Sequence, residues 1–183
     1  PQIENKLVLT GNPRWDYLRS DLATLYGAQA AAYNNQHGRI ILINTNSGNF
    51  NPAKKKPEEV YRDYVRDGKL DPNNAEQMAF WKDYSKFEKA NFEAAIPMTR
   101  RLAKEFPGHT IILRPHPSER LEAYAEKLAD LANVKVLFEG SAAPWIMASD
   151  VLVHTDCTTG LEAFALGKPS ICFETVPSTL HTI

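Results

Sequence analysis

The sequence predicts an α/β domain in which a parallel β-sheet carries helices on both faces. Short apolar runs alternate with segments whose apolar residues recur at helical spacing. The runs at 40–43 and 111–113 are continuously apolar, which is typical of strands buried on both sides. Strands of this type that alternate with helices are joined by crossover connections, and such connections give parallel sheets.

The first half of the chain is predicted to contain one buried strand and three helices. Pro97 lies within the longest helical pattern, and we expect it to kink or restart the helix because it lacks an N–H. Pro107 and Gly108 then stop that helix. In chain order, the predicted elements are a helix over 16–26, a strand over 39–44, a helix near 58–65 and a helix from about 74 to 106.

The second half alternates regularly between strands and helices. Ser118 is predicted to cap a helix that has Leu121, Tyr124 and Leu128 on one face. Gly167 is a suitable residue to end another helix. The predicted strands cover 109–114, 134–138, 150–154 and 170–173, and the helices between them follow Ser118 or cover 143–148 and 159–166.

Length and composition are those of one globular domain. The chain has 183 residues, of which 43% are hydrophobic and 23% charged, and its formal net charge is −1. A general nucleic-acid binder would carry a basic excess, so we expect no nucleic-acid partner. No apolar run approaches the roughly 20 residues that span a bilayer, and we expect a cytoplasmic protein.

Three polar segments are predicted to follow strands at one edge of the sheet. They cover 44–49, 114–119 and 154–162. Ligands of open parallel sheets bind at the carboxyl ends of the strands. We therefore expect the topology to bring these three segments together at one site.

The segment Arg114-Pro115-His116-Pro117 holds a histidine between two prolines. Each proline fixes its own φ and restricts the residue before it, so little backbone entropy remains to be lost on binding. A histidine held in this way can donate to a phosphate or to a leaving-group oxygen. A rigid turn with a surface imidazole explains the same pattern without a ligand.

The segment 155–162 combines hydroxyl groups with a predicted helix start. Thr158, Thr159 and the backbone N–H groups there predict a phosphate site that the helix dipole strengthens. Glu162 lies one turn into the helix and is a candidate to bind ribose hydroxyls. Alternatively, Thr159 and Glu162 form a capping box that needs no ligand, although this leaves the hydroxyl of Thr155 unexplained.

The loop after the first buried strand has amide and hydroxyl groups. Asn46, Ser47 and Gly48 are candidates for ligand binding because the glycine permits close backbone approach; a polar loop without a ligand is the alternative. The chain contains neither a G-x-G-x-x-G pattern nor a P-loop. It also lacks the H-E-x-x-H and C-x-x-C spacings of zinc sites, so we expect no metal and no cofactor.

Three stretches, in this order, resemble GT-B-type glycosyltransferases of bacterial surface-polysaccharide synthesis. Residues 11–16 (GNPRWD) are similar to the element that ends the N-terminal domain in this group. Residues 111–119 (IILRPHPSE) are similar to the HP motif of capsule enzymes, including sialyl-, Kdo- and CDP-glycerol transferases. Residues 148–169 resemble the stretch in those enzymes that ends in GKP. The resemblance covers about residues 6–175, with no counterpart for 51–91.

The resemblance implies a Rossmann-like domain that forms one half of a GT-B fold. In this interpretation residues 1–37 are a linker segment from a preceding domain. Residues 38–183 are the nucleotide-sugar-binding domain, truncated at its C-terminus. The missing N-terminal domain usually supplies the catalytic base, so we expect this fragment of a metal-independent glycosyltransferase to be inactive alone.

The resemblance also implies roles for individual residues. His116 contacts the donor phosphate and assists departure of the nucleotide, Thr158 and Thr159 hold the phosphate, and Glu162 faces the ribose or caps its helix. The two motifs together favour a CMP- or CDP-linked sugar donor. Besides the catalytic His116, the expected donor-binding residues are Asn46, Ser47, Gly48, Arg114, Pro117, Ser118, Thr155, Asp156, Thr158, Thr159, Gly160 and Glu162.

The expected second substrate is a glycan or lipid-linked acceptor. A peripheral contact of the protein with the inner face of the cell membrane is neither predicted nor excluded. Two other functions remain as alternatives. A UDP-GlcNAc 2-epimerase shares the architecture but usually carries an SGG-x-x-E-E run where this chain has TTGLE at 158–162. A non-catalytic nucleotide-binding domain would bind nucleotide without turning over a sugar donor.

Overall fold

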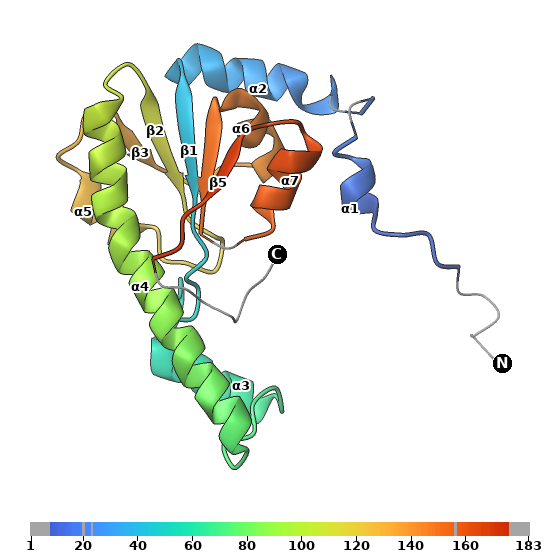
Figure 1. Cartoon of the computed structure of the whole chain (residues 1–183), viewed down its shortest axis with the longest axis vertical. Helices are drawn as coiled ribbons and strands as arrows, with labels where there is room; N and C mark the ends of the chain where they lie inside the picture. The colour runs from blue at the N-terminus through green and yellow to red at the C-terminus, as the bar shows by residue number, and fades with distance from the viewer. Residues whose placement is uncertain (1–7, 20, 23, 156, 176–183) are drawn as a thin grey trace.

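The computed structural model describes residues 8–19, 21–22, 24–155 and 157–175, and it confirms the α/β class. Five strands, all parallel, form one sheet with helices on both faces, which is a Rossmann-like arrangement (Figure 1). The strands are β1 (Ile40–Asn44), β2 (Thr110–Arg114), β3 (Val134–Val136), β4 (Val151–His154) and β5 (Ser170–Cys172).

The strand order β3-β2-β1-β4-β5 places the first strand at the centre of the sheet. Ile41 is in register with Ile111 on one side and with Val151 on the other. After β1 the chain adds β2 and β3 on one side and then returns to add β4 and β5 on the other. The carboxyl ends of β1, β2 and β4 therefore meet where the strand order reverses, and ligands of open α/β sheets bind at such a reversal.

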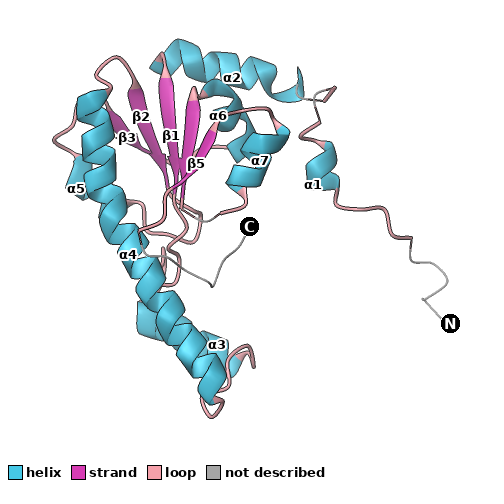
Figure 2. Ribbon diagram, in the orientation of Figure 1, coloured by secondary structure: helices cyan, strands magenta, loops and turns pink. Residues whose placement is uncertain are grey.

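Two helical layers cover the sheet (Figure 2). One contains α4 (Ala75–Glu105) and α5 (Glu122–Leu128). The other contains α2 (Thr24–His37), α6 (Ala142–Ala148) and α7 (Thr159–Ala165).

Alternation along β1 assigns its side chains to the two layers. Ile41 and Ile43 pack in the core beneath α4 and α5, whereas Ile40 and Leu42 pack in the core beneath α2 and α6. All four are buried, as expected for a central strand covered on both sides.

Residues 51–91, which have no counterpart in the resemblance, form most of a projection beside the sheet. The N-terminal half of α4 extends past the sheet and packs with α3 (Pro57–Arg66) (Figure 1). The ring of Trp81 in α4 lies 4.9 Å from that of Tyr64 and 5.9 Å from that of Tyr61, measured between centroids.

The structure differs from three local predictions. The helix expected over 16–26 is replaced by α1 (Pro13–Asp16), which Asn12 caps, and by α2, which begins only at Thr24. Helix α4 continues through Pro97, so of the two expected outcomes, a kink or a restart, the restart does not occur. Ser118 does not cap α5, because the residue at the N-cap is Leu121 and the Ser118 hydroxyl contacts His116 instead.

Residues 24–37, which lie within the predicted linker segment, form α2. Ala30 and Tyr33 of this helix are buried in the core beneath it. Among the helices that the structure describes, none combines the length and the apolar character needed to cross a bilayer.

The core beneath α2 and α6 depends on Trp145. This side chain is fully buried, stacks on Tyr33 with 3.7 Å between ring centroids, and donates its indole N–H to Glu139 O. We expect Trp145→Ala to lower the free energy of unfolding by about 3–5 kcal/mol, because it opens a large cavity. Urea denaturation followed by circular dichroism measures the change.

Phe164→Ala is the matched control, because Phe164 is 83% exposed on α7. We expect it to change the free energy of unfolding by less than about 0.5 kcal/mol. Equal effects of the two substitutions would contradict the burial of Trp145.

Candidate functional site

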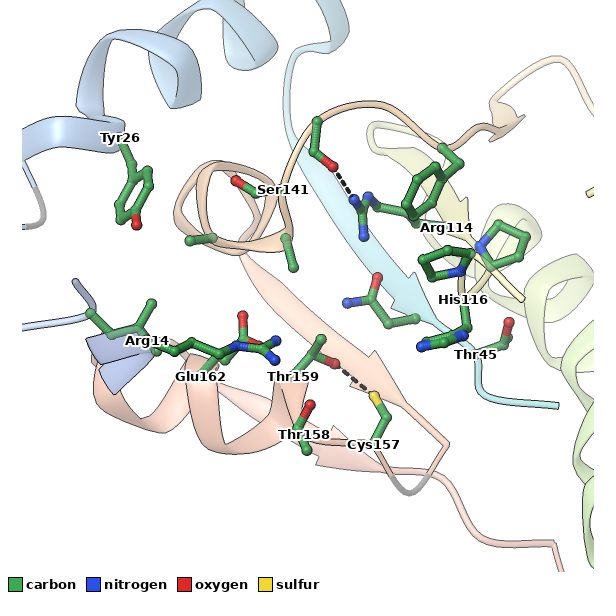
Figure 3. Close-up of a pocket in the computed structure, with 18 of the residues that line it drawn as sticks. Arg14, Tyr26, Thr45, Arg114, His116, Ser141, Cys157, Thr158, Thr159 and Glu162 are labelled. Carbon is green, nitrogen blue, oxygen red and sulfur yellow. Dashed lines mark hydrogen bonds and ion pairs between the residues drawn. The ribbon is translucent and has the colours of Figure 1, made fainter. Parts of the chain in front are cut away.

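A cavity of about 480 Å³ opens at the carboxyl edge of the sheet, where the strand order reverses (Figure 3). Its walls come from the ends of β1 and β2, the start of α6, the β4–α7 turn and the N-terminal segment. The lining residues are Arg14, Tyr17, Leu18, Tyr26, Asn44, Thr45, Arg114, Pro115, His116, Pro117, Phe138, Gly140, Ser141, Ala142, Ala143, Cys157, Thr158, Thr159 and Glu162.

Arg114 places a buried positive charge in the wall of this cavity. The residue is 7% exposed, and its guanidinium lies 4.4 Å from the ring centroid of Phe138. Its Nη2 donates to Gly140 O, whereas its Nε lacks a partner among the described residues. Burial lowers the pKa of Arg114, while the fields of Tyr33 and Glu162 act in the opposite direction. No carboxylate in the described part of the chain forms an ion pair with it.

Asn44, the last residue of β1, adds an unsatisfied amide to the same wall. It is 3% exposed, and within the described ranges neither its Oδ1 nor its Nδ2 has a hydrogen-bond partner. An unpaired buried amide is costly, by roughly 1–3 kcal/mol on the scale of protein mutations. A bound polar ligand would satisfy Asn44 and the Nε of Arg114 together.

The turn after β2 fixes the orientation and the tautomer of His116. The backbone N–H of Ser118 donates to Nδ1 over 3.2 Å, and the Ser118 hydroxyl lies 2.7 Å from the same nitrogen. A nitrogen that accepts a backbone N–H carries no proton, so neutral His116 has its proton on Nε2. The imidazole at the rim of the cavity therefore has an N–H donor available for a ligand.

Glu119 links the segments that follow β1 and β2. Its buried carboxylate accepts from the Thr45 hydroxyl over 2.7 Å, from the His116 backbone N–H over 2.9 Å and from the Tyr124 hydroxyl over 2.5 Å. Burial and the neighbouring Glu119 raise the pKa of Tyr124, so its hydroxyl remains a donor. One carboxylate thus joins β1, the β2 turn and α5.

The turn after β4 presents two hydroxyl residues to the cavity. Thr158 and Thr159 both line it, and the Thr159 hydroxyl lies 2.7 Å from Cys157 Sγ. The capping-box alternative is wrong. The N-cap residue is Thr158, whose side chain makes no capping bond, and the carboxylate of Glu162 pairs with Arg14.

The far side of the cavity is mainly apolar and aromatic. Tyr17, Leu18 and Tyr26 reach it from the N-terminal segment, and Ala142 and Ala143 from the start of α6. Figure 3 shows Tyr26 at this side and His116 at the other. The cavity therefore has a polar side at Arg114 and His116 and a far side that is apolar and aromatic apart from the Arg14–Glu162 ion pair.

The structure brings six of the thirteen predicted site residues into one cavity: Arg114, His116, Pro117, Thr158, Thr159 and Glu162 line it. The others that are described lie outside the lining. Thr155 is buried and accepts the Asn46 backbone N–H over 3.1 Å, which braces the loop after β1. Ser47 of the same loop is buried and does not line the cavity, and Asp156 lies outside the described residues.

The two predicted glycines serve packing rather than ligand approach. A Cβ on Gly48 would collide with the side chain of Ser118, and a Cβ on Gly160 would collide with the ring of His154. Gly48 thus lets the loop after β1 lie against the turn that orients His116. Gly160 likewise lets α7 start beside the end of β4.

The sequence analysis missed several polar residues of the cavity, among them Asn44, Thr45, Arg14 and Ser141. Asn44 and Thr45 belong to a segment that was singled out, but the prediction selected residues one to four positions later. Arg14 lies in the GNPRWD stretch, which was used only for the resemblance. The signal for Arg14 was its place directly after Asn12 and Pro13, the residues that start the helix carrying it.

No family model, curated protein or solved structure matches this chain. Within the described residues, no cluster of three or more His, Cys, Asp or Glu side chains has the geometry to hold a metal ion.

Glu88 of α4 supports the loop after β1 from the side away from the cavity. Its carboxylate accepts the backbone N–H groups of Asn49 and Phe50 over 2.8 and 2.9 Å, and the Asn49 side chain over 3.1 Å. Burial raises the pKa of Glu88 to about 7, although the hydrogen bonds from Phe50, Tyr84 and Asn49 lower it.

This raised pKa predicts a stability that depends on pH. The folded protein holds a proton on Glu88 more tightly than the unfolded chain does, so the contribution is fully present below about pH 4.5 and is lost as pH rises through about 7. The expected loss is at most roughly 3 kcal/mol. We expect Glu88→Gln to remove this part of the pH dependence in urea denaturation at pH 5 and pH 8.

Glu93→Gln is the matched control, because the Glu93 side chain is 61% exposed on the same helix. It is expected to leave the difference between pH 5 and pH 8 unchanged. If Glu88→Gln and Glu93→Gln have the same pH dependence, Glu88 does not titrate near neutrality.

Proposed function

We propose that this cavity binds the phosphate and nucleoside of a nucleotide-sugar donor. On this proposal the chain is the donor-binding domain of a GT-B-type glycosyltransferase of surface-polysaccharide synthesis, with a CMP- or CDP-linked donor. The observation that carries the proposal is Arg114, a buried guanidinium at the carboxyl end of β2 with an unsatisfied Nε and no carboxylate partner in the described residues.

The electrostatics of the cavity favour an anion. A buried charge is normally paired, because taking it out of water costs several kcal/mol. Arg114 lacks such a pair in the described part of the chain, and a phosphate matches its planar donor geometry. The Nε2 proton of His116 and the hydroxyls of Thr158 and Thr159 add neutral donors to the lining of the same cavity.

The two-ended shape of the cavity fits a nucleotide better than an inorganic anion. Its volume of about 480 Å³ is in the range of small-molecule sites. Tyr26 provides aromatic surface on the side of the cavity away from His116 (Figure 3), and the ring of Phe138, which packs on Arg114, also lines the cavity. A nucleoside monophosphate has the same division into a planar apolar part and a charged part.

Transfer in this site breaks the bond between the anomeric carbon and the phosphate oxygen. The electron pair goes to the phosphate, while an acceptor hydroxyl forms the new bond and loses its proton to a base that the resemblance assigns to the other domain. The proton on His116 Nε2 and the charge of Arg114 would stabilise the departing phosphate. No metal is needed for this step.

Titration calorimetry with CMP, CDP, UMP and UDP tests the proposal. We expect cytidine nucleotides to bind, and Arg114→Gln and His116→Ala each to weaken binding of CMP by about 1–3 kcal/mol, which is roughly 5- to 150-fold in Kd. The reason is the loss of one charge-assisted hydrogen bond to phosphate in each variant.

Arg100→Gln is the matched control. Arg100 pairs with Asp130 on the exposed surface of α4, outside the cavity lining, so its replacement is expected to leave Kd unchanged. A preference for UDP would favour the epimerase-like alternative or a UDP-sugar donor. Absence of nucleotide binding by the folded protein would reject the proposal.

A further inference from the structure

Glu162 places a carboxylate in the wall of a cavity that is otherwise positively charged. The residue is 3% exposed, lies on the first turn of α7 and lines the cavity beside Thr158 and Thr159. An unpaired carboxylate here would repel a phosphate and would itself be costly to bury. The position therefore needs a cation, and the fold supplies one from a distant part of the chain.

That cation is Arg14 of α1, 148 residues away in sequence. Its Nη2 forms an ion pair with Glu162 Oε1, and 58% of its side chain remains exposed. A guanidinium has five N–H groups in a planar fork, so one contact with Glu162 leaves further donors for a second anion. Figure 3 shows Arg14 reaching along Glu162 toward Thr159, inside the cavity.

The local sequence of α1 is built to hold Arg14 in this place. Gly11 has φ of +83°, which favours glycine, and turns the chain into the helix. Asn12 caps the helix, and its Oδ1 accepts the backbone N–H of Arg14 over 3.0 Å. Pro13 occupies the first turn with its φ already restricted. These local interactions hold the backbone of Arg14, and they do not depend on the contacts of its side chain.

We propose that Arg14 contacts the donor phosphate directly and that Glu162 is the residue that positions it. This inference rests on the proposed function and adds a second arginine to the phosphate site. Arg114 acts from the sheet edge and Arg14 from the N-terminal segment, on opposite sides of the cavity (Figure 3). Glu162 does not contact the donor in this arrangement. Its carboxylate holds the guanidinium of Arg14 in the orientation that faces the phosphate.

The arrangement also explains why one acidic residue is compatible with anion binding. The charges of Arg14 and Glu162 cancel, so Arg114 provides the net positive charge of the three. Removing Arg14 alone would take away the guanidinium donors and would leave the carboxylate of Glu162 without its ion-pair partner. Removing Glu162 alone would leave the charge of Arg14 but release its side chain.

A double-mutant cycle on the folded protein tests these relations, with CMP and inorganic pyrophosphate as the probes. We expect Arg14→Ala to weaken CMP binding more than 10-fold, and Glu162→Gln to weaken it by a smaller factor. In the Arg14→Ala background, the same Glu162→Gln change is expected to strengthen binding, because it removes the repulsion. The double variant should still bind CMP at least 5-fold more weakly than the wild type.

Two results would overturn the inference. One is unchanged CMP affinity of Arg14→Ala. The other is full recovery of wild-type affinity in the double variant, since Arg14 would then only neutralise Glu162. Arg19→Ala is the matched control, because Arg19 pairs with Asp21 on the surface and does not line the cavity. Urea denaturation of each variant shows that folding is retained.

The outcomes separate this inference from the proposed function. If CMP binding depends on Arg114 and His116 but not on Arg14, the nucleotide site stands and the role of Arg14 fails. If pyrophosphate binds in an Arg14-dependent manner while no nucleotide binds, the phosphate contact stands and the nucleotide-sugar function fails. If neither probe binds the folded protein, both are rejected.

Discussion

The central strand β1 is the element on which the rest of this structure depends. It pairs with β2 on one side and β4 on the other, and its side chains enter both cores alternately. Because parallel strands run in the same direction, this pairing aligns Asn44 with Arg114 and with His154 at one edge of the sheet. Strand order and register therefore place the ends of these three strands at the edge where the cavity opens.

The carboxyl edge of this sheet carries several buried charged and polar side chains. Glu119 and Glu88 each satisfy several donors and so fix the loops that follow β1 and β2. Arg114 and Asn44 instead keep polar groups without partners in the described residues. Folding energy favours satisfied polar groups in the interior, so this unsatisfied pair is the feature on which the proposal of a bound ligand rests.

Much of the fold was predictable from the sequence because its elements have strong local signals. The continuously apolar runs gave the strands β1 and β2, and Gly167 ends α7 with a positive φ, as expected. The predictions failed where a local signal had two readings. Tyr17, Leu18 and Leu22 have helical spacing, but Asn12 and Pro13 start a helix earlier and it ends at Asp16. Ser118 has the chemistry of a helix cap, but its hydroxyl contacts His116.

The sequence by itself determined the α/β class, the parallel sheet and the edge at which polar segments gather, because these follow from periodicity and from the rules of strand connection. Only the tertiary structure decided which polar residues face the cavity. Thr158 lines it while Thr155, three residues earlier, braces a neighbouring loop. The pairing of Arg14 with Glu162 joins residues 148 positions apart. Local spacing carries no information about such a contact, because it forms only where the fold brings Arg14 of α1 within reach of Glu162 of α7.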